Sequence, residues 1–432
     1  MNPTAIEHHL GLVLLQWMVI MAAAWFFGRA GQRLGQPLAV GEIFAGIVLG
    51  PSLLGLVWPS IHGALFPGQP FFALFPDETQ QSLQLLGKLG LILLLFQVGM
   101  EFDYGHLASR SRAVLAVSAA GIVAPVAGGL LIGPWLHRNF APETPFAGFQ
   151  MFVCIALSIT ALPIMGRILL EMRLERTALG ALGISSAAID DVVGWVGLAV
   201  ISALAKSQFE WMPFLGQVAG VLVFFGGLMT LVGPWLRGRW QKSRGFAEGR
   251  LGPGFMTVLL TVLFTCCLIT NKLGIFSIFG AFLLGVALHQ DTSLVKAWRE
   301  KFADFVLVAL VPIFFTNTGL RTEIGSLNTG TAWLGAVVVL VVATAGKFGG
   351  CWAAARFTGQ PQRESLCVAA LMNTRALMAL VAINIGFELK LLPRELFTMF
   401  VLMALLTTAM TGPMLRAWLP EDLKKLVPRV GG

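Results

Sequence analysis

The chain has 432 residues, of which 56% are hydrophobic and 12% are charged, and its mean hydropathy is +0.79. A soluble protein of this length carries about twice that charged fraction. Apolar runs of about 20 residues recur from end to end, which predicts an all-α polytopic membrane protein and excludes a separate soluble domain. The net charge of +8 does not indicate a nucleic acid partner, because the basic residues gather in the connections between apolar runs.

Thirteen apolar segments are predicted to cross the membrane. They are 10–28, 39–56, 83–100, 113–136, 148–170, 177–204, 213–236, 253–271, 275–289, 302–319, 331–355, 365–387 and 392–417. The first nine residues hold Glu7 and no basic residue, so we expect the first segment to be a mature helix rather than a cleaved signal peptide. The stretch 60–77, with phenylalanines among prolines, is expected to be an interfacial connection.

The basic residues are distributed unequally between the two sides of the membrane. Those in or beside the connections after odd-numbered segments number 21, against 6 after even-numbered segments. By the positive-inside rule we expect the N-terminus outside and the C-terminus in the cytoplasm, in a bacterial inner (plasma) membrane. The basic stretch Arg237–Arg250 is then the cytoplasmic link between the two halves. Residues 421–432 are expected to form a short cytoplasmic tail without a regulatory domain.

The five cysteines all fall in apolar segments, and the six histidines fall near segment ends without the spacing of metal ligands. The sequence therefore predicts no disulfide framework and no cofactor.

Two short motifs recur at the same distance along the chain. Ile43–Gly50 (IFAGIVLG) resembles Ile278–Gly285 (IFGAFLLG), and Leu94–Met100 (LLFQVGM) resembles Phe314–Leu320 (FFTNTGL). Both matches are shifted by seven segments, and since seven is odd, the matched helices run in opposite directions. This is the pattern of inverted repeats in secondary transporters, whose site lies where the halves meet. The expected organisation is one transmembrane domain over 1–420, with repeat one at about 10–204, a linker helix at about 213–236 and repeat two at about 253–417.

Two adjacent carboxylates, Asp190 and Asp191, lie within an otherwise apolar segment. Each ionised carboxylate near the bilayer centre costs about 2.5–3.5 kcal/mol on insertion scales, so an intramembrane pair is expected to be functional. On a helix the two side chains point about 100° apart with about 1.5 Å of rise, so they share one site but face different neighbours. The alternatives are a pair at the membrane surface, or two carboxylates neutralised by partners for stability.

The segment 148–170 is predicted to contain a broken helix at Ser158–Ile164 (SITALPI). Pro163 cannot donate to the carbonyl of Ile159, and its ring disfavours helix in the residue before it. The unwound residues would include Thr160 and Ala161, and the freed carbonyls with the Thr160 hydroxyl would be oxygen ligands for a small cation. The alternative is a simple kink.

The same seven-segment shift pairs this break with Asn373, Thr374 and Arg375, which interrupt another apolar run. Discontinuous helices at paired positions indicate a transport site. The alternative for this segment is an ordinary helix with an interhelical hydrogen bond.

Other polar residues inside the predicted segments extend the set of candidates. Lys347 is the natural counter-charge to one aspartate, and Glu42 is a candidate partner for Arg375. For capping, or for contacts behind the site, the candidates are Gln97 and Asn317 at equivalent repeat positions, and Ser185 and Ser186 within two turns of the aspartates. Back-bonding to the helix is the alternative for the two serines.

These residues resemble the monovalent cation:proton antiporter-2 family along essentially the whole chain. Gly41–Pro51 is similar to its second-helix motif, Ser158–Ile164 to its unwound crossing helix and Ala188–Asp191 (AIDD) to its ion-binding helix. The region from Asn373 to Pro413 is similar to the branch that contains plant and fungal potassium/proton exchangers, which often has Asn-Asp at the double aspartate. The double aspartate itself looks like that of the electrogenic sodium/proton antiporters.

The resemblance implies a sodium/proton antiporter-like fold and a homodimer whose core bundle moves elevator-fashion against a dimerisation domain. It also implies that Asp191 is the ion and proton carrier, that Asp190 pairs with Lys347, and that Na⁺ or K⁺ binds at Asp191 beside Thr160. Many family members follow the arginine of the second break with Gly and a nearby Glu. This chain has Ala, Leu, Met and Ala there, so the counter-charge of that arginine stays open.

The function hypothesis is secondary antiport of Na⁺ or K⁺ against protons, in which the two ions compete for Asp191. Asp190 would be protonated when it releases Lys347 and salt-bridged when it does not. Two carboxylates with one lysine favour two protons per cation, which is an electrogenic exchange. The partners are then a monovalent cation, protons and the lipid bilayer, without nucleic acid or nucleotide, and no enzymatic activity is expected.

Three alternatives remain open. Two acidic residues disfavour an organic-anion transporter of the same architecture, although Lys347 and Arg375 are compatible with one. For an ion channel, the sequence shows no ring-forming filter segment. An intramembrane aspartyl protease needs two aspartates that share a proton across a substrate-sized gap, whereas neighbours on one helix point apart.

Overall fold

The structure is a computed structural model, and it describes residues 3–36, 38–55, 57, 60, 75, 77–100, 111–174, 177–206, 211–273 and 276–425. Within these residues all regular secondary structure is helical. Eight of the described helices are long and apolar enough to cross a membrane, one further pair is bent by 45°, and four apolar helices are shorter. Together they coincide with the thirteen predicted segments, which confirms the all-α polytopic membrane fold. The predicted interfacial connection at 60–77 and the end of the tail lie mostly outside the described residues.

The chain divides into two compact units, and each unit takes segments from both halves of the sequence. The first unit consists of Met1–Ala24, His62–Asp103 and Ser202–Asn317. Its helices are the first part of α1 (Pro3–Arg33), α4 (Asp77–Met100), the end of α8 (Ala178–Lys206), α9 (Trp211–Gly227), η2 (Leu228–Val232), α10 (Gly233–Gln241), α11 (Arg244–Glu248), α12 (Pro253–Lys272), α13 (Ser277–Leu288), α14 (Thr292–Trp298), η3 (Arg299–Ala303), η4 (Val306–Leu310) and most of α15 (Val311–Leu320).

The second unit consists of Trp25–Ile61, Tyr104–Ile201 and Thr318–Gly432. Its helices are the end of α1, α2 (Leu38–Leu49), α5 (Ser111–Phe140), α6 (Phe146–Ser158), α7 (Leu162–Glu171), most of α8, the end of α15, η5 (Ile324–Ser326), α16 (Gly330–Phe357), α17 (Gln362–Met372), α18 (Ala376–Glu388), α19 (Arg394–Trp418) and α20 (Glu421–Lys424). Both predicted breaks and the double aspartate lie in this unit.

The two repeated motifs meet each other through glycines. In the first unit, a Cβ built at Gly99 of α4 would lie 3.1 Å from the Cα of Gly285 in α13. In the second unit, a Cβ at Gly319 would lie 2.6 Å from the Cα of Gly46 in α2. Helices approach this closely only where side chains are absent. Each motif of one half therefore packs on the other motif of the opposite half, which is why the glycines recur at one spacing.

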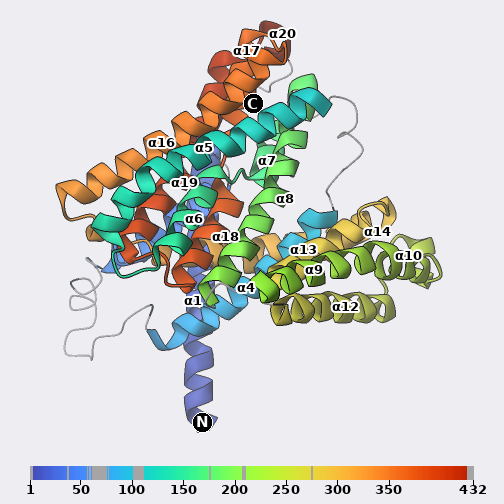
Figure 1. The fold of residues 1–432 in the computed structure, drawn as a ribbon. Helices are drawn as coiled ribbons and strands as arrows, with labels where there is room; N and C mark the ends of the chain where they lie inside the picture. The colour runs from blue at the N-terminus through green and yellow to red at the C-terminus, as the bar shows by residue number, and fades with distance from the viewer. Residues whose placement is uncertain are drawn as a thin grey trace. The chain divides into compact units, whose positions relative to one another are not determined.

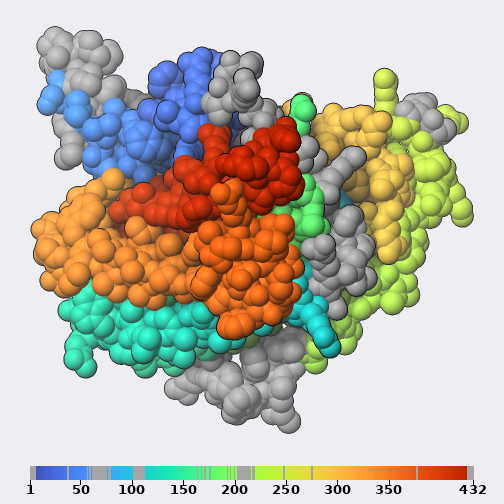
Figure 2. Space-filling model, turned by 90° about the horizontal axis from the view of Figure 1, so that it is seen from above, coloured from blue at the N-terminus to red at the C-terminus, as the bar shows by residue number. Residues whose placement is uncertain are grey.

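The second unit is organised around α16, which lies between α5 and α19 on the face shown in Figure 2, while α5 and α16 run side by side in Figure 1. Gly346 and Gly350 lie on the same face of α16, four residues apart. A Cβ at Gly346 would lie 3.0 Å from the Cα of Pro125, and one at Gly350 would lie 2.7 Å from the carbonyl oxygen of Ala120. Small residues at this spacing let two membrane helices pack backbone to backbone. This packing fixes the depth of Lys347, the residue after Gly346.

We expect Gly350→Ala to destabilise the protein by about 1–3 kcal/mol, because the added methyl group meets backbone rather than a side chain that can turn away. The matched control is Gly349→Ala, since a Cβ at Gly349 has no described atom within 4 Å. Alanine at that position should be neutral or stabilising by about 0.5–1 kcal/mol through helix propensity. Thermal unfolding of the detergent-solubilised variants measures both effects, and equal midpoints would contradict the packing argument.

Candidate functional site

The first break separates α6 from α7. Helix α6 ends at Ser158, and Ile159 is extended with φ −64° and ψ 138°. Residues 159–161 are not helical, and α7 begins at Leu162. Thr160 and Ala161 lie in the break, whereas Pro163 lies in the first turn of α7, where its missing N–H is not needed by the helix. The proline therefore starts a new helix rather than kinking an old one.

The second break separates α17 from α18 at Asn373, Thr374 and Arg375. It contains neither glycine nor proline, and bonds from other segments hold it open. The Thr374 hydroxyl lies 3.0 Å from that of Thr411, and the backbone amide of Arg375 donates to the Thr408 hydroxyl at 3.3 Å. Both threonines belong to α19, so this helix supplies the polar partners that the interrupted backbone needs.

The two breaks cross and bond to each other. The Ala161 amide donates to the carbonyl of Thr374 at 2.8 Å, and the Thr160 hydroxyl lies 3.3 Å from the carbonyl of Met372. Unwound backbone inside a membrane is tolerated where it is buried in protein and its polar groups are bonded. The bonds between the two breaks, and those from α19, provide partners of this kind.

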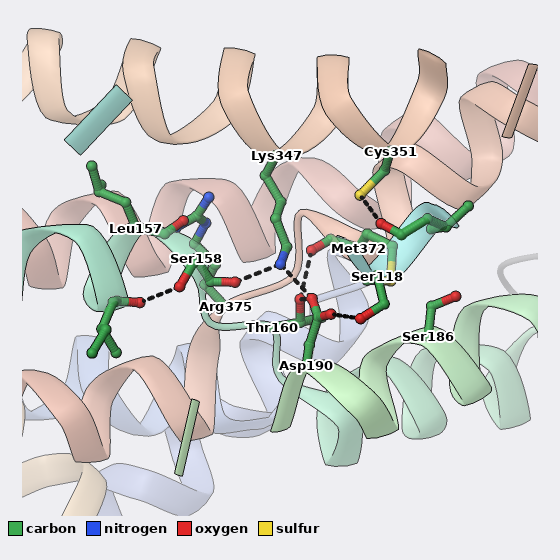
Figure 3. Close-up of polar contacts among 12 residues, drawn as sticks. Ser118, Leu157, Ser158, Thr160, Ser186, Asp190, Lys347, Cys351, Met372 and Arg375 are labelled. Atoms are coloured by element: carbon green, nitrogen blue, oxygen red, sulfur yellow. Dashed lines mark hydrogen bonds and ion pairs between the residues drawn. The ribbon is translucent and has the colours of Figure 1, made fainter. Parts of the chain in front are cut away.

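Asp190, on α8, accepts three hydrogen bonds from three other segments (Figure 3). The Ser118 hydroxyl of α5 donates to Oδ1 at 2.6 Å. The Thr160 hydroxyl donates to Oδ2 at 2.8 Å, and Lys347 Nζ donates to the same oxygen at 2.5 Å. The side chains of Asp190 and Lys347 are both 0% exposed. An ion pair this deeply buried is retained only when further hydrogen bonds satisfy both partners.

Lys347 and Arg375 satisfy the C-terminal carbonyls of α6. Lys347 Nζ donates to the carbonyl of Ser158 at 2.5 Å. Arg375 donates to the carbonyl of Leu157 through Nη1, and to that of Ala343 in α16 through Nη2 at 2.6 Å. The last turn of a helix carries partial negative charge on its unbonded carbonyls, so a cation is favoured there. The last carbonyls of α6, just before the first break, are thus bonded by the protein's own cations.

These contacts identify the partners of Arg375 that the sequence left open. Its guanidinium is fully buried and bonds to backbone carbonyls. Among the described residues no carboxylate forms an ion pair with it, and the predicted pairing with Glu42, a buried residue of α2, is not found. A helix end and one carbonyl of α16 take the place of a counter-ion.

Asp191 has a different environment from its neighbour. It is buried, and within the described part of the chain its Oδ1 has no hydrogen-bond partner. The backbone amide of Leu162, at the start of α7, bonds the carboxylate. A helix N-terminus carries partial positive charge and stabilises an anion. Thr160, which was expected to lie beside the cation at Asp191, donates its hydroxyl to Asp190.

The other predicted residues, two serines of α8 and two amides, have no described hydrogen bond to Asp190 or Asp191. Ser185 and Ser186 are buried, and the Ser186 hydroxyl donates to the carbonyl of Val114 at 3.3 Å rather than to a carboxylate. Gln97 and Asn317 belong to the first unit, which is described separately from the site.

Three site residues are absent from the sequence prediction: Ser118, Thr408 and Thr411. The two threonines belong to a buried Thr407, Thr408 and Thr411 stripe on one face of α19, and this helical spacing was available in the sequence. Ser118 has no such signal, because it is an isolated serine in the apolar helix α5. Only the tertiary structure brings it to Asp190.

A family model for the transmembrane sodium/hydrogen exchanger matches residues 18–420. The Na(+)/H(+) antiporter NhaS4 of Synechocystis sp. is 34% identical over 93% of this chain and 96% of its own length. Cation/H(+) antiporter 18 of Arabidopsis thaliana is 32% identical over 96% of this chain, and the K(+)/H(+) antiporter 1 of Saccharomyces cerevisiae is 27% identical over the same share. The chain covers 50% and 47% of those two relatives.

Among solved structures, that of the sodium proton antiporter MjNhaP1 from Methanocaldococcus jannaschii is similar in fold. The TM-score is 0.66 with 13% sequence identity, over 98% of this chain and 100% of that one.

Breaking the buried ion pair from either side should destabilise the fold more than removing both charges. Asp190→Asn or Lys347→Met alone leaves an uncompensated buried group, which costs about 3–5 kcal/mol, whereas the double variant should recover most of that loss. A double-mutant cycle on thermal unfolding measures the coupling.

The control for this cycle is the exposed pair Arg363 and Glu421, whose charged atoms lie 3.5 Å apart. Removing either of these exposed charges should leave the unfolding midpoint nearly unchanged. Additive effects at Asp190 and Lys347 would contradict the pairing.

Proposed function

The chain belongs to the transmembrane sodium/hydrogen exchanger family, and we propose that it exchanges a monovalent cation, Na⁺ or K⁺, for protons across the membrane. Asp191 is the group for which the cation and the proton compete. The sequence relatives include antiporters named for sodium and for potassium, so the proposal covers both ions. Selectivity between them depends on cavity size and ligand number.

The observation that carries this proposal is the difference between two adjacent aspartates. Both oxygens of Asp190 accept hydrogen bonds, from three donors in all, whereas Asp191 keeps a buried oxygen that bonds to no described residue. A carrier needs such a group, because it must bind either of two ions and release both. A carboxylate with no ion bound is costly in a membrane interior. An empty carrier therefore moves poorly, and this couples the two fluxes.

Asp190 and Lys347 are proposed to set the net charge that crosses the membrane when the site carries protons. Lys347 is held by two acceptors, the Asp190 carboxylate and the carbonyl of Ser158. When Asp190 takes a proton it can no longer hold an ammonium group strongly, so the lysine is released. Two protons, one on each aspartate, would then cross in exchange for one cation, and the cycle would move net charge.

An organic-anion substrate is disfavoured by the bonding of the two buried cations. Lys347 and Arg375, the groups that would attract an anion, already donate to the C-terminal carbonyls of α6. The carboxylate oxygen that has no described hydrogen-bond partner is Oδ1 of Asp191, and its negative charge repels anions.

The orientation that we propose has the N-terminus outside and the C-terminus in the cytoplasm of the plasma membrane. It rests on the 21 basic residues in or beside the connections after odd-numbered segments, against 6 after even-numbered ones.

Asp191→Asn should abolish cation-driven proton flux in proteoliposomes, because the amide neither takes up a proton nor provides a charge for the cation. Flux is read with a pH-sensitive dye after addition of Na⁺ or K⁺. The control is Glu143→Gln, which removes an exposed carboxylate from the connection between α5 and α6 and should leave the flux intact. Retained exchange in the Asp191 variant would refute the carrier assignment.

If two protons cross in exchange for one cation, each cycle moves net charge across the membrane, and the exchange rate should depend on the membrane potential. Potassium gradients clamped with an ionophore set the potential, and the initial rate of Na⁺-driven proton flux is measured at each value. Two protons per cation should make the rate change steadily with potential. An exchange rate that is indifferent to potential would rule out this stoichiometry while leaving antiport itself in place.

A further inference from the structure

Asn373, in the second break, carries buried polar atoms that are not satisfied, as Asp191 does on α8. Its side chain is 0% exposed, and neither Oδ1 nor Nδ2 has a hydrogen-bond partner among the described residues. A buried amide without partners bears its full desolvation penalty, and an apolar residue of similar shape would avoid it. Buried groups of this kind are rare and call for a specific explanation, of which a bound ion is one.

The position of Asn373 is fixed from both sides. The carbonyl of the preceding residue, Met372, lies 3.3 Å from the Thr160 hydroxyl, and the carbonyl of the following residue, Thr374, accepts from the Ala161 amide at 2.8 Å. Asn373 is therefore held against the first break, immediately before the α7 start that bonds Asp191. Asp191 and Asn373 therefore both lie next to the first break.

The neighbouring polar side chains have partners among the described residues. Asp190 accepts three bonds, Lys347 donates to two acceptors and the Thr374 hydroxyl is paired with Thr411. Oxygen atoms that bond nothing else are the ones available to a transported cation. Alkali cations are hard ions that prefer carboxylate and amide oxygens.

We propose that the side-chain amide oxygen of Asn373 is a ligand of the transported cation, opposite the carboxylate of Asp191. This assignment rests on the proposed antiport function and adds a ligand from the second repeat to the carrier on the first. Cation binding then ties α8, which carries Asp191, to the second break through side chains.

The test is the apparent KM for Na⁺ and K⁺ in proteoliposomes containing Asn373→Leu or Asn373→Ala. Loss of one ligand should raise the apparent KM about tenfold or more, a change of about 1.4 kcal/mol per tenfold, with the maximal rate little changed. Asn373→Asp keeps an oxygen in place and should hold the apparent KM within a few-fold of the wild type. In detergent, the thermal stabilisation of the protein by added cation should shrink in the Leu variant.

A purely structural role makes the opposite prediction, and Asn384 provides the comparison. Its buried amide is fully bonded, to the Thr318 hydroxyl at 2.9 Å, the carbonyl of Leu380 at 2.9 Å and Arg321 at 3.1 Å. Asn384→Leu should lower the unfolding midpoint without raising the apparent KM. Asn373→Leu should raise the apparent KM without lowering the midpoint in cation-free buffer.

The outcomes separate the two proposals. If the wild-type protein shows no cation-driven proton flux, the proposed function fails and the ligand assignment fails with it. If the wild type exchanges ions but the Leu and Ala variants keep their KM within twofold, or if both variants fail to fold, only the role of Asn373 is overturned.

Discussion

The buried ion pair between Lys347 and Asp190 is the interaction on which the rest of the site depends. Neither side chain is exposed, so the pair is stable only because additional donors and acceptors complete its bonding. Those groups come from α5 through Ser118, from the first break through Thr160 and from the end of α6 through Ser158. Each supporting helix is thereby fixed at one depth in the second unit. Close packing of α5 on α16 through glycines brings the lysine to that depth.

The ends of the broken helices provide partners for the buried charges of the site, and the buried charges provide partners for the helix ends. An interrupted helix leaves carbonyls at one end and amides at the other without partners, which is costly in an apolar medium. Here the carbonyl end of α6 receives Lys347 and Arg375, and the amide end of α7 faces Asp191. The charges of the site and the ends of the helices therefore neutralise each other, and no separate counter-ion is found for Arg375 in the described part of the chain.

The two neighbouring carboxylates, Asp190 and Asp191, have different surroundings and are proposed to have different roles. Their directions differ by about 100° on the helix, so one faces the lysine and the hydroxyl donors while the other faces the crossing. Asp190, whose two oxygens are both bonded, is suited to hold the Lys347 ammonium group. Asp191, with an oxygen that has no described partner, is suited to exchange a cation for a proton. The same contrast between satisfied and unsatisfied groups singles out Asn373 in the second break.

The sequence by itself determined the membrane-spanning helices, the repeat and the double aspartate, because hydropathy, glycine spacing and the cost of an intramembrane charge act through local composition. It also located both interruptions, through Pro163 in one case and a polar run in the other. The tertiary structure alone decided which donor serves which acceptor. Ser118 and Thr160 donate to Asp190, and Arg375 donates to the carbonyls of α6. These pairings join segments that are far apart in the chain. Hydrogen bonding between side chains of different helices depends on the angle at which the helices cross and on the depth of each residue. The residue pattern within a single segment predicts neither quantity.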